Sequence, residues 1–367
     1  MTDLRAAVVG TGFMGRVHAE ALARIGVSVA GVVGSSPERA RASGVAPAYG
    51  SFDEMLDDDS VDAVHICSPN DRHFPQARAA LRAGKHVICE KPLALTADHA
   101  RELCDTAAEF GLVNAVCFVN RFYPLCQDAA ARVASGSVGP VRLVTGSYLQ
   151  DWLAKDTDWN WRLDTTVGGS LRVVGDIGSH WLDLVSYVIG QRVDTVMADL
   201  TTAIPQRLRP AGSVETFTQS NGDGEPVTVT TEDMAGLLLR FADGARGVLT
   251  LSQVSPGRKN TLSFEVSGAD ASLAWSLENP EHLWIGHRDG PNQLQLRDAG
   301  DYPAGHAQGY PDTFKALFRA TYAAIADGEP PQAPDYPTFT DGLEQVLVGE
   351  AIAESARTGQ WVSVRRS

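Results

Sequence analysis

The sequence Gly10-Thr11-Gly12-Phe13-Met14-Gly15 stands between a short apolar run at 4–10 and a segment whose apolar residues recur at helical spacing. A GxGxxG pattern has a physical meaning in that position. The first glycine permits a tight turn, the second lets a ligand approach the backbone, and the third lets helix and strand pack closely. The N-terminus of the helix also favours negative charge. The pattern therefore predicts a strand–turn–helix unit that binds the pyrophosphate of a dinucleotide.

The first third of the chain alternates short apolar runs with helical patterns. Such alternation is typical of a doubly wound α/β domain, in which helices cover both faces of a parallel sheet. We expect this domain to span residues 1–121. Its predicted strands lie at 4–10, 27–33, 61–67, 86–89 and 112–118, and its later helices at 72–83 and 96–110.

The remainder, residues 122–367, has a different pattern. Alternating residues at 141–145 and within 227–241 predict strands, and Asp243-Gly244 predicts a hairpin turn. We therefore expect a second, α+β domain with an antiparallel sheet. Further strands are predicted at 262–266, 271–277 and 282–286, helices at 178–189, 311–327 and 338–357, and an irregular connection at 204–226.

Composition excludes several classes of function. A formal net charge of −14 and a pI near 5.0 disfavour nucleic acid as a partner, because phosphate backbones require clustered Lys and Arg. No apolar stretch is long enough to cross a bilayer, and the N-terminus shows no signal-peptide pattern. The five cysteines form no CxxC pair, and no cluster has metal-ligand spacing. We expect a soluble cytoplasmic protein without a metal site.

The end of the second predicted strand bears on the choice of cofactor. A carboxylate is expected there to hold the adenosine ribose of NAD. The chain instead reads Gly34-Ser35-Ser36-Pro37, with no carboxylate before Glu38. Ser35, Ser36 and Arg39 could receive a 2′-phosphate, Arg39 through a charge-assisted contact. This segment favours NADP, with NAD as the alternative, and Arg39 as a solvated helix residue is the competing interpretation.

Several motifs follow the glycine loop: Ser68-Pro69-Asn70 with His73, Glu90-Lys91-Pro92, Asn120-Arg121-Phe122 and Asp176-x-Gly-x-His180. With them the chain resembles the Gfo/Idh/MocA oxidoreductase family, named for glucose–fructose oxidoreductase and inositol dehydrogenase. The resemblance implies a Rossmann domain followed by a large, open, mostly antiparallel sheet that often forms oligomer contacts. We accordingly expect a homodimer or homotetramer through the C-terminal sheet. Substrates of the family are mostly sugars, cyclitols and their derivatives.

The resemblance also assigns site residues. It makes Lys91, Asp176 and His180 the catalytic residues, and it places Ser68-Pro69-Asn70 near the nicotinamide half of the cofactor and Glu90 near its ribose. The residues expected to contact the dinucleotide are then Gly10, Gly12, Phe13, Met14, Gly15, Ser35, Ser36, Arg39, Ser68, Pro69, Asn70, His73, Glu90 and Lys91.

Oxidation of a secondary alcohol sends a hydride to the cofactor and requires the protein to take a proton. His180 is the expected base, because an imidazole transfers protons near neutral pH. Lys91 would hold the substrate oxygen as negative charge develops. Asp176 would orient the imidazole or bind a neighbouring hydroxyl. The competing interpretations are a surface lysine at 91, a helix cap at 176 and a structural helix histidine at 180.

An aromatic and polar segment, Asp158 to Asp164 with Trp152 before it, suits a sugar-binding cleft. Aromatic rings stack on sugar C–H faces, and polar side chains bind hydroxyls. We expect Trp161, Arg162 and Arg121 to contact substrate together with Asp176 and His180. A loop anchored by buried indoles is the alternative.

Three functions are compatible with these motifs. The favoured one is an NAD(P)-dependent oxidoreductase that acts on a secondary hydroxyl or carbonyl of a sugar or cyclitol. The second is a glycosidase of the same fold, in which tightly bound NAD oxidises the sugar transiently. The third is a regulator that binds dinucleotide without turnover, and intact Lys91 and His180 argue against it.

Overall fold

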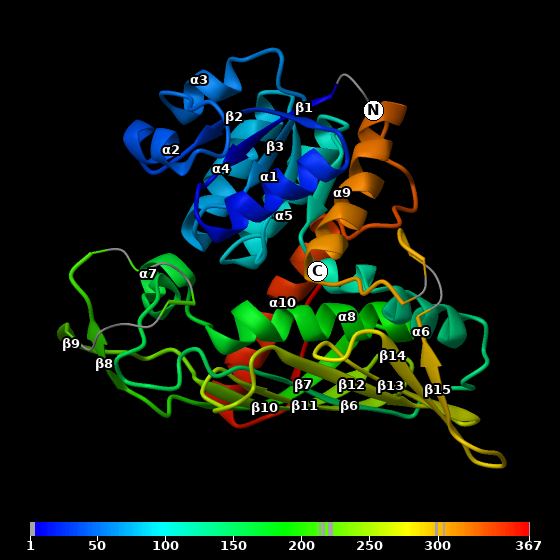
Figure 1. Ribbon diagram of the computed structural model, residues 1–367. Coiled ribbons are helices and arrows are strands. Elements are labelled where there is room, and N and C mark those ends of the chain that lie inside the picture. The colour runs from blue at the N-terminus through cyan, green and yellow to red at the C-terminus, as the bar shows by residue number, and fades with distance from the viewer. Residues whose placement is uncertain are drawn as a thin grey trace. The chain divides into compact units, whose positions relative to one another are not determined.

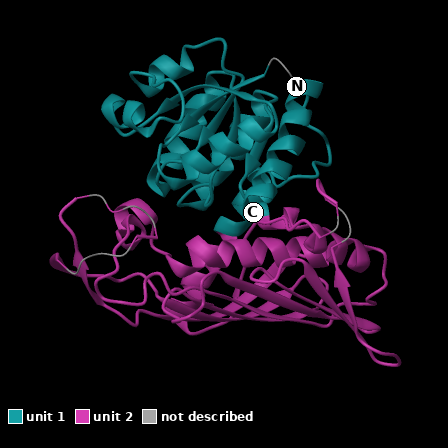
Figure 2. Cartoon of the chain, viewed as in Figure 1, with its two compact units in different colours: residues 1–119, 310–346 teal, residues 120–309, 347–367 magenta. Residues whose placement is uncertain are grey.

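The computed structural model describes residues 4–212, 214, 217–218, 223–297, 300–303 and 305–366. The chain divides into two compact units, residues 1–119 with 310–346, and residues 120–309 with 347–367 (Figure 2). A single boundary after Arg121 is therefore too simple a division. The chain returns to the first unit at Tyr310, because the apolar face of a late helix packs in that unit.

Unit 1 contains a parallel sheet, five-stranded within the described residues, with the order β2-β1-β3-β4-β5. The segment that follows α2 (Pro37–Ser43) pairs with the outer edge of β2 through one isolated parallel bridge, between Val32 and Ala48. With that bridge the order matches the Rossmann arrangement, whose crevice lies where the strand order reverses, at β1 and β3. The strands are β1 Arg5–Val9, β2 Ser28–Val33, β3 Ala63–Ile66, β4 His86–Cys89 and β5 Asn114–Val116.

Helices cover both faces of this sheet (Figure 1). Apolar residues of α4 and α5 join one face of β1, β3 and β4 in a single buried cluster. The helices of unit 1 are α1 Phe13–Arg24, α2 Pro37–Ser43, α3 Phe52–Leu56, α4 Asn70–Arg82, α5 Ala97–Glu109, α9 Tyr310–Asp327 and the start of α10 Phe339–Thr358.

The late helix α9 covers the other face of the sheet beside α1. Phe318 packs against the rings of His18 and His65 with centroid separations of 4.9 and 4.7 Å. Tyr322 stacks on His65 and is fully buried. These contacts give residues 310–346 their place in the first unit.

Unit 2 is built on a sheet that is nine-stranded in the described part of the chain, with the order β15-β14-β13-β12-β6-β11-β10-β7-β16. All neighbours pair antiparallel except β6 and β11, which are parallel. The strands are β6 Leu143–Leu149, β7 Val193–Thr201, β10 Met234–Phe241, β11 Arg246–Ser252, β12 Thr261–Ser267, β13 Ala271–Ser276, β14 His282–His287, β15 Gln293–Leu296 and β16 Val362–Ser363. The expected mostly antiparallel sheet is confirmed.

Helices of unit 2 lie on one face of this sheet, and α8 runs along it (Figure 1). Trp181 anchors α8 by donating its indole N–H to the Ser263 carbonyl over 2.8 Å. Along β10 and β11 buried and exposed residues alternate, so the opposite face is open. The other helices and turns here are α6 Pro124–Ala134, α7 Thr165–Gly168, α8 Ser179–Ile189, the 3₁₀ turns Val119–Phe122 and Trp161–Leu163, and a π-helical turn, Val174–Gly178.

The segment 204–226 is not wholly irregular. Two strands, β8 Gln206–Arg209 and β9 Glu225–Thr228, pair antiparallel at its two ends. Arg207 fixes β8 because its buried guanidinium donates to the backbone carbonyls of Leu153 and Lys155. The polar composition of this segment therefore gave no sign of the two paired strands, which a buried arginine holds in place. Among the helices of the described residues, none has both the length and the apolarity needed to cross a membrane.

Candidate active site

The glycine loop follows β1 and leads into α1. Gly10 has φ +107°, and a Cβ there would lie 2.5 Å from the Cys67 carbonyl oxygen. A Cβ on Gly15 would lie 1.9 Å from the Gly10 carbonyl oxygen, whereas a Cβ on Gly12 would have no atom within 4 Å. The first and third glycines are thus required by packing. The second leaves open space at the N-terminus of α1, where a phosphate is favoured.

The neighbouring residues expected at the cofactor lie around this loop and β2. Phe13 is 38% exposed, and Met14 accepts a hydrogen bond from the Tyr310 hydroxyl at 3.7 Å. Ser36 caps α2 by accepting the Arg39 backbone N–H over 3.3 Å. Ser35 and the Arg39 side chain are exposed. They are therefore accessible to a ligand at the end of β2.

The loop after β3 carries Ser68, Pro69 and Asn70, and Asn70 begins α4. His73 is buried, with Nδ1 2.7 Å from the Pro92 carbonyl and Nε2 2.9 Å from the Ser68 carbonyl. Burial lowers the pKa of His73, although two facing carbonyl oxygens favour its charged form. Both ring nitrogens therefore face the protein backbone. His73 therefore joins the loop after β3 to the loop after β4. In this position it supports both loops, and a direct contact with the cofactor stays a prediction.

Glu90 and Lys91 follow β4, and the Lys91–Pro92 peptide bond is cis. Glu90 is buried, and Lys91 is half-buried. One Glu90 carboxylate oxygen lies 3.1 Å from His18 Nε2, and the other accepts the Lys91 backbone N–H over 3.3 Å. The glutamate of the triplet thus fixes the backbone that carries the lysine.

The second unit supplies Asp176 from the π-helical turn before α8. Its Oδ1 accepts the Nε–H of Arg162 over 2.9 Å, and its Oδ2 accepts the side-chain amide of Gln253 over 2.8 Å. Gly178 is the N-cap of α8, so Asp176 does not cap that helix. π-helical turns are frequent at functional sites. Both observations favour a site role for Asp176 over the capping alternative.

Gln253 belongs to a buried network that sequence spacing does not reveal. Its amide oxygen accepts from the Arg172 guanidinium over 3.1 Å, and Arg172 pairs in turn with the buried carboxylate of Asp233. Glu232 accepts the backbone N–H groups of Arg172 and Val174, at 2.9 and 3.0 Å. This network orients the amide that holds Asp176. Arg172 lies 60 to 81 residues before its partners Glu232, Asp233 and Gln253, and no local motif marks them.

His180 lies in the first turn of α8, two residues after Gly178. Its ring lies 6.4 Å from the ring of Tyr148, measured between centroids. Tyr148 is buried and donates its hydroxyl to Asn260 over 2.7 Å, and burial raises its pKa. The imidazole therefore adjoins a neutral phenol.

The predicted substrate residues of unit 2 differ in their surroundings. The Arg162 guanidinium lies over the Trp161 ring, 4.3 Å from its centroid, and also contacts Asn160. Trp161, Arg162 and Asp176 are thus brought together. Arg121 instead donates twice to the buried carboxylate of Asp183, over 2.8 and 2.5 Å. That pair fastens the 119–122 turn to α8, and a substrate contact for Arg121 stays a prediction.

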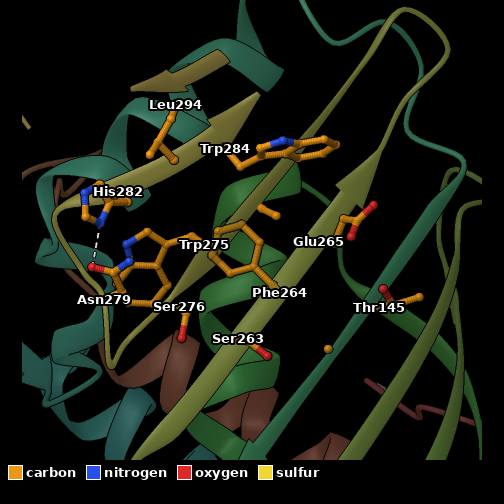
Figure 3. Close-up of a pocket in the computed structure, with 12 residues that line it drawn as sticks. Thr145, Ser263, Phe264, Glu265, Trp275, Ser276, Asn279, His282, Trp284 and Leu294 are labelled. Atoms are coloured by element: carbon orange, nitrogen blue, oxygen red, sulfur yellow. Dashed lines mark hydrogen bonds between the residues drawn. The ribbon is translucent and has the colours of Figure 1, made fainter. Parts of the chain in front are cut away.

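A hollow of about 420 Å³ lies elsewhere in unit 2 and contains none of the predicted site residues. It is lined by outward-facing residues of the large sheet, including Ser263, Trp284 and Leu294, and His282 hydrogen-bonds Asn279 at its margin (Figure 3). It belongs to the open face, apart from the Asp176 network.

Comparison with known proteins agrees with the fold described above. A family model described as an oxidoreductase family with an NAD-binding Rossmann fold matches residues 4–118, and the GFO/IDH/MocA C-terminal domain model matches residues 126–274. Levoglucosan dehydrogenase of Pseudarthrobacter phenanthrenivorans (strain DSM 18606 / JCM 16027 / LMG 23796 / Sphe3) is 30% identical over 99% of both chains. D-glucoside 3-dehydrogenase of Escherichia coli (strain K12) is 32% identical over 68% of this chain and 70% of its own.

A solved structure of levoglucosan dehydrogenase in complex with NADH and levoglucosan superposes with a TM-score of 0.88 at 28% identity. It covers 99% of this chain and 100% of that chain. The matched relatives include dehydrogenases and reductases that act on CH–OH groups of sugars and polyols. The chain therefore belongs to the Gfo/Idh/MocA family of nicotinamide-dependent oxidoreductases and is an enzyme of the sugar and polyol dehydrogenase class.

Proposed function

We propose that the enzyme transfers a hydride between a nicotinamide cofactor and a secondary hydroxyl or carbonyl carbon of a sugar, cyclitol or derivative. The observation that carries the proposal is the fixed Asp176 carboxylate. Arg162 and Gln253 hold it in the turn that leads directly into the helix of His180. A carboxylate fixed in the turn before the helix that carries an imidazole suits an alcohol substrate, whose hydroxyls need an acceptor and a base.

Each catalytic residue has a proposed task. His180 takes the hydroxyl proton as the hydride leaves carbon and returns it in the reverse direction. Lys91 stabilises negative charge on the same oxygen. Asp176 binds a hydroxyl next to the reacting carbon and so fixes which carbon faces the cofactor. Glu90 supports Lys91, since its carboxylate accepts the Lys91 backbone N–H.

The proposed substrate is a pyranose ring with free secondary hydroxyls. Trp161, whose ring carries the Arg162 guanidinium, offers an aromatic surface beside groups that bind hydroxyls. The relatives named for levoglucosan and for a D-glucoside support the same class. Levoglucosan, methyl glucosides and inositols are the first compounds to assay.

For the cofactor we propose NADP, with NAD as the alternative. No carboxylate stands between the end of β2 and Pro37, and the exposed Ser35 and Arg39 follow β2, where we expect a 2′-phosphate to bind. The relative crystallised with NADH supports the alternative. A direct comparison of both dinucleotides decides between them.

We also propose a homodimer or homotetramer through the open face of the large sheet. That face carries apolar side chains that water would otherwise contact, which is typical of a protein interface. Leu238, Val248 and Leu294 are 46%, 42% and 60% exposed. Leu238 and Val248 are direct cross-strand partners. Leu238→Glu with Val248→Lys should shift the protein to monomers in sedimentation, and an unchanged mass would contradict this interface.

The function is tested by Lys91→Ala and His180→Ala. We expect each to lower kcat at least a hundredfold, about 2.7 kcal/mol of transition-state stabilisation, with less than threefold change in dinucleotide Kd. The exposed Lys259 and His287 provide matched controls, since Lys259→Ala and His287→Ala remove the same groups from the surface. Turnover that survives either test variant would contradict the assigned roles. A wild-type protein that reduces neither dinucleotide with any compound of the panel would contradict the function itself.

A further inference from the structure

Four buried side chains of unit 1 form one continuous chain of hydrogen bonds. His18 Nε2 lies 3.1 Å from Glu90 Oε1, His18 Nδ1 lies 2.9 Å from His65 Nδ1, and His65 Nε2 lies 3.0 Å from the Tyr322 hydroxyl. His18, His65 and Tyr322 are 0% exposed and Glu90 is 7% exposed. The members come from α1, β3, the end of β4 and α9. Folding alone brings them together.

The surroundings of this chain are apolar or neutral. Phe314 and Phe318 of α9 pack against the His18 ring at 5.5 and 4.9 Å between centroids. Cys117, after β5, places its sulfur 3.7 Å from His18 Nε2, and Cys67 comes two residues after His65, just beyond the end of β3. Burial raises the pKa of both thiols well above the usual value, so they stay protonated. Glu90 is the acidic group that the histidines face.

The contact between the two Nδ1 atoms restricts where protons can reside. A separation of 2.9 Å between two ring nitrogens is a hydrogen bond and so holds one proton. Burial, with His18 as a further cause, lowers the pKa of His65 well below its usual value, so His65 is neutral. If His18 is neutral too, the two rings must be opposite tautomers. One carries its proton on Nδ1 and the other on Nε2.

The Glu90 carboxylate selects between the two arrangements. An ionised carboxylate only accepts, so His18 must carry its proton on Nε2 and donate it to Glu90. His18 Nδ1 is then bare and accepts from His65 Nδ1–H. His65 Nε2 is bare in turn and accepts the Tyr322 hydroxyl. Every polar atom on this path then has a partner of the correct kind within the path, as buried groups require.

We propose that His18 and His65 are an obligatory pair of opposite tautomers that holds the Glu90 carboxylate and thereby positions the Glu90–Lys91 turn. His18, His65 and Tyr322 are positioning residues for the catalytic Lys91. The link is the second Glu90 oxygen, which accepts the Lys91 backbone N–H. This inference rests on the proposed function for its effect on turnover. The tautomer assignment does not depend on it.

The same geometry has one competing explanation. His18 Nε2, a Glu90 oxygen and Cys117 Sγ lie within 4.8 Å of one another, and such donors bind zinc. A bound ion would require a bare His18 Nε2 and a Cys117 thiolate. The hydrogen-bond chain instead uses His18 Nε2–H and leaves the thiol protonated. The two explanations therefore predict different protonation of the same two atoms.

Two-bond ¹H–¹⁵N correlation spectra of the full-length protein, labelled at histidine and free of dinucleotide, test the assignment. A bare ring nitrogen resonates far downfield of a protonated one. We expect His18 to be protonated on Nε2 alone and His65 on Nδ1 alone, with His18→Gln and His65→Gln spectra assigning the signals. The same tautomer at His18 and His65, or an imidazolium at either position, would overturn the proposal. So would stoichiometric zinc binding with micromolar or tighter affinity that Cys117→Ser abolishes.

Two variants of His18 test the positioning role. A glutamine amide takes the place of Nε2 and can still donate to Glu90, whereas an asparagine amide takes the place of Nδ1 and reaches only His65. With a turned-over sugar, we expect His18→Gln to keep kcat within about threefold and His18→Asn to lower it at least tenfold. Neither should change the sugar KM more than twofold. Equal loss in both variants would contradict positioning through Glu90. If the wild-type enzyme shows no turnover, that result counts against the proposed function, and the spectra alone then decide the tautomer assignment.

Discussion

Two glycines of one loop, Gly12 and Gly15, should respond in opposite ways to the same added methyl group. Gly12 has φ −74° and ψ −162°, which any residue can adopt, and no atom lies within 4 Å of the position that its Cβ would take. Alanine there loses the N-cap preference of glycine but restricts the unfolded chain. These small effects oppose each other, so we expect Gly12→Ala to change the free energy of unfolding by less than about 0.5 kcal/mol.

Gly15 should behave differently. Its Cβ would lie 1.9 Å from the Gly10 carbonyl oxygen, and Cβ atoms essentially never approach closer than 3.0 Å. Backbone must therefore move by about 1 Å where α1 crosses β1. Overpacking of this kind costs about 1–3 kcal/mol in a deformable core, and backbone on both sides leaves little room for relaxation. We expect Gly15→Ala to destabilise unit 1 by about 3 kcal/mol or more.

Dinucleotide affinity provides the second readout. The Gly12 methyl would occupy the open space at the N-terminus of α1, so we expect Kd for dinucleotide to rise at least tenfold, about 1.4 kcal/mol. Scanning calorimetry and isothermal titration measure the two quantities. Gly290→Ala, in the exposed turn between β14 and β15 with no atom within 4 Å of the added methyl group, is the matched control and should change neither. If Gly12→Ala binds dinucleotide normally, the phosphate does not approach that glycine and the reasoning is refuted.

Other predictions concern the cofactor, the Asp176 network and pH. Arg39→Ala should weaken NADP binding at least fivefold and NAD binding less than twofold, because only NADP carries the 2′-phosphate; equal losses by titration would count against that contact. Gln253→Leu should destabilise the fold by about 1–3 kcal/mol and lower kcat about tenfold, since Asp176 and Arg172 each lose a partner. Calorimetry measures the stability and sugar turnover measures kcat. If both values are unchanged, the network does not position Asp176. Burial lowers the pKa values of His65 and His73, so at acidic pH the unfolded chain binds protons that the folded one does not. As the pH falls below about 6.5, the free energy of unfolding should therefore fall by up to about 1.4 kcal/mol per pH unit for each histidine. Urea unfolding at pH 7 and 5.5 tests this, and equal stability would show that these histidines are protonated when folded.

Local patterns predicted the elements that local physics determines. The strand–turn–helix at Gly10 and the Asp243-Gly244 hairpin both form as their spacing indicates. Ser51 accepts the Glu54 N–H while Glu54 accepts the Gly50 N–H, which is a capping interaction within five residues. Such features need no distant partner, and the sequence suffices to predict them.

The remaining features depend on distant partners. Arg207 and Asp233 fix β8 through buried contacts that composition cannot show, so composition alone predicted an irregular segment at 204–226. Gln253 became part of the site only because β11 ends beside the Asp176 turn. His65 lies on a buried strand, and its contacts with His18 and Tyr322 connect it to the Glu90–Lys91 turn. Periodicity identifies a buried histidine and says nothing of what it touches.

The late helix α9 has a consequence for how the protein is made. Phe318 and Tyr322 complete the cover over His18 and His65, yet they are synthesised some 250 residues after His65. On the ribosome the N-terminal sheet must therefore wait, with one face incompletely covered, until nearly the whole polypeptide has emerged. A gene fragment that ends after Phe122 would encode a nucleotide-binding half without this cover, and its purified product should aggregate where the full-length chain does not.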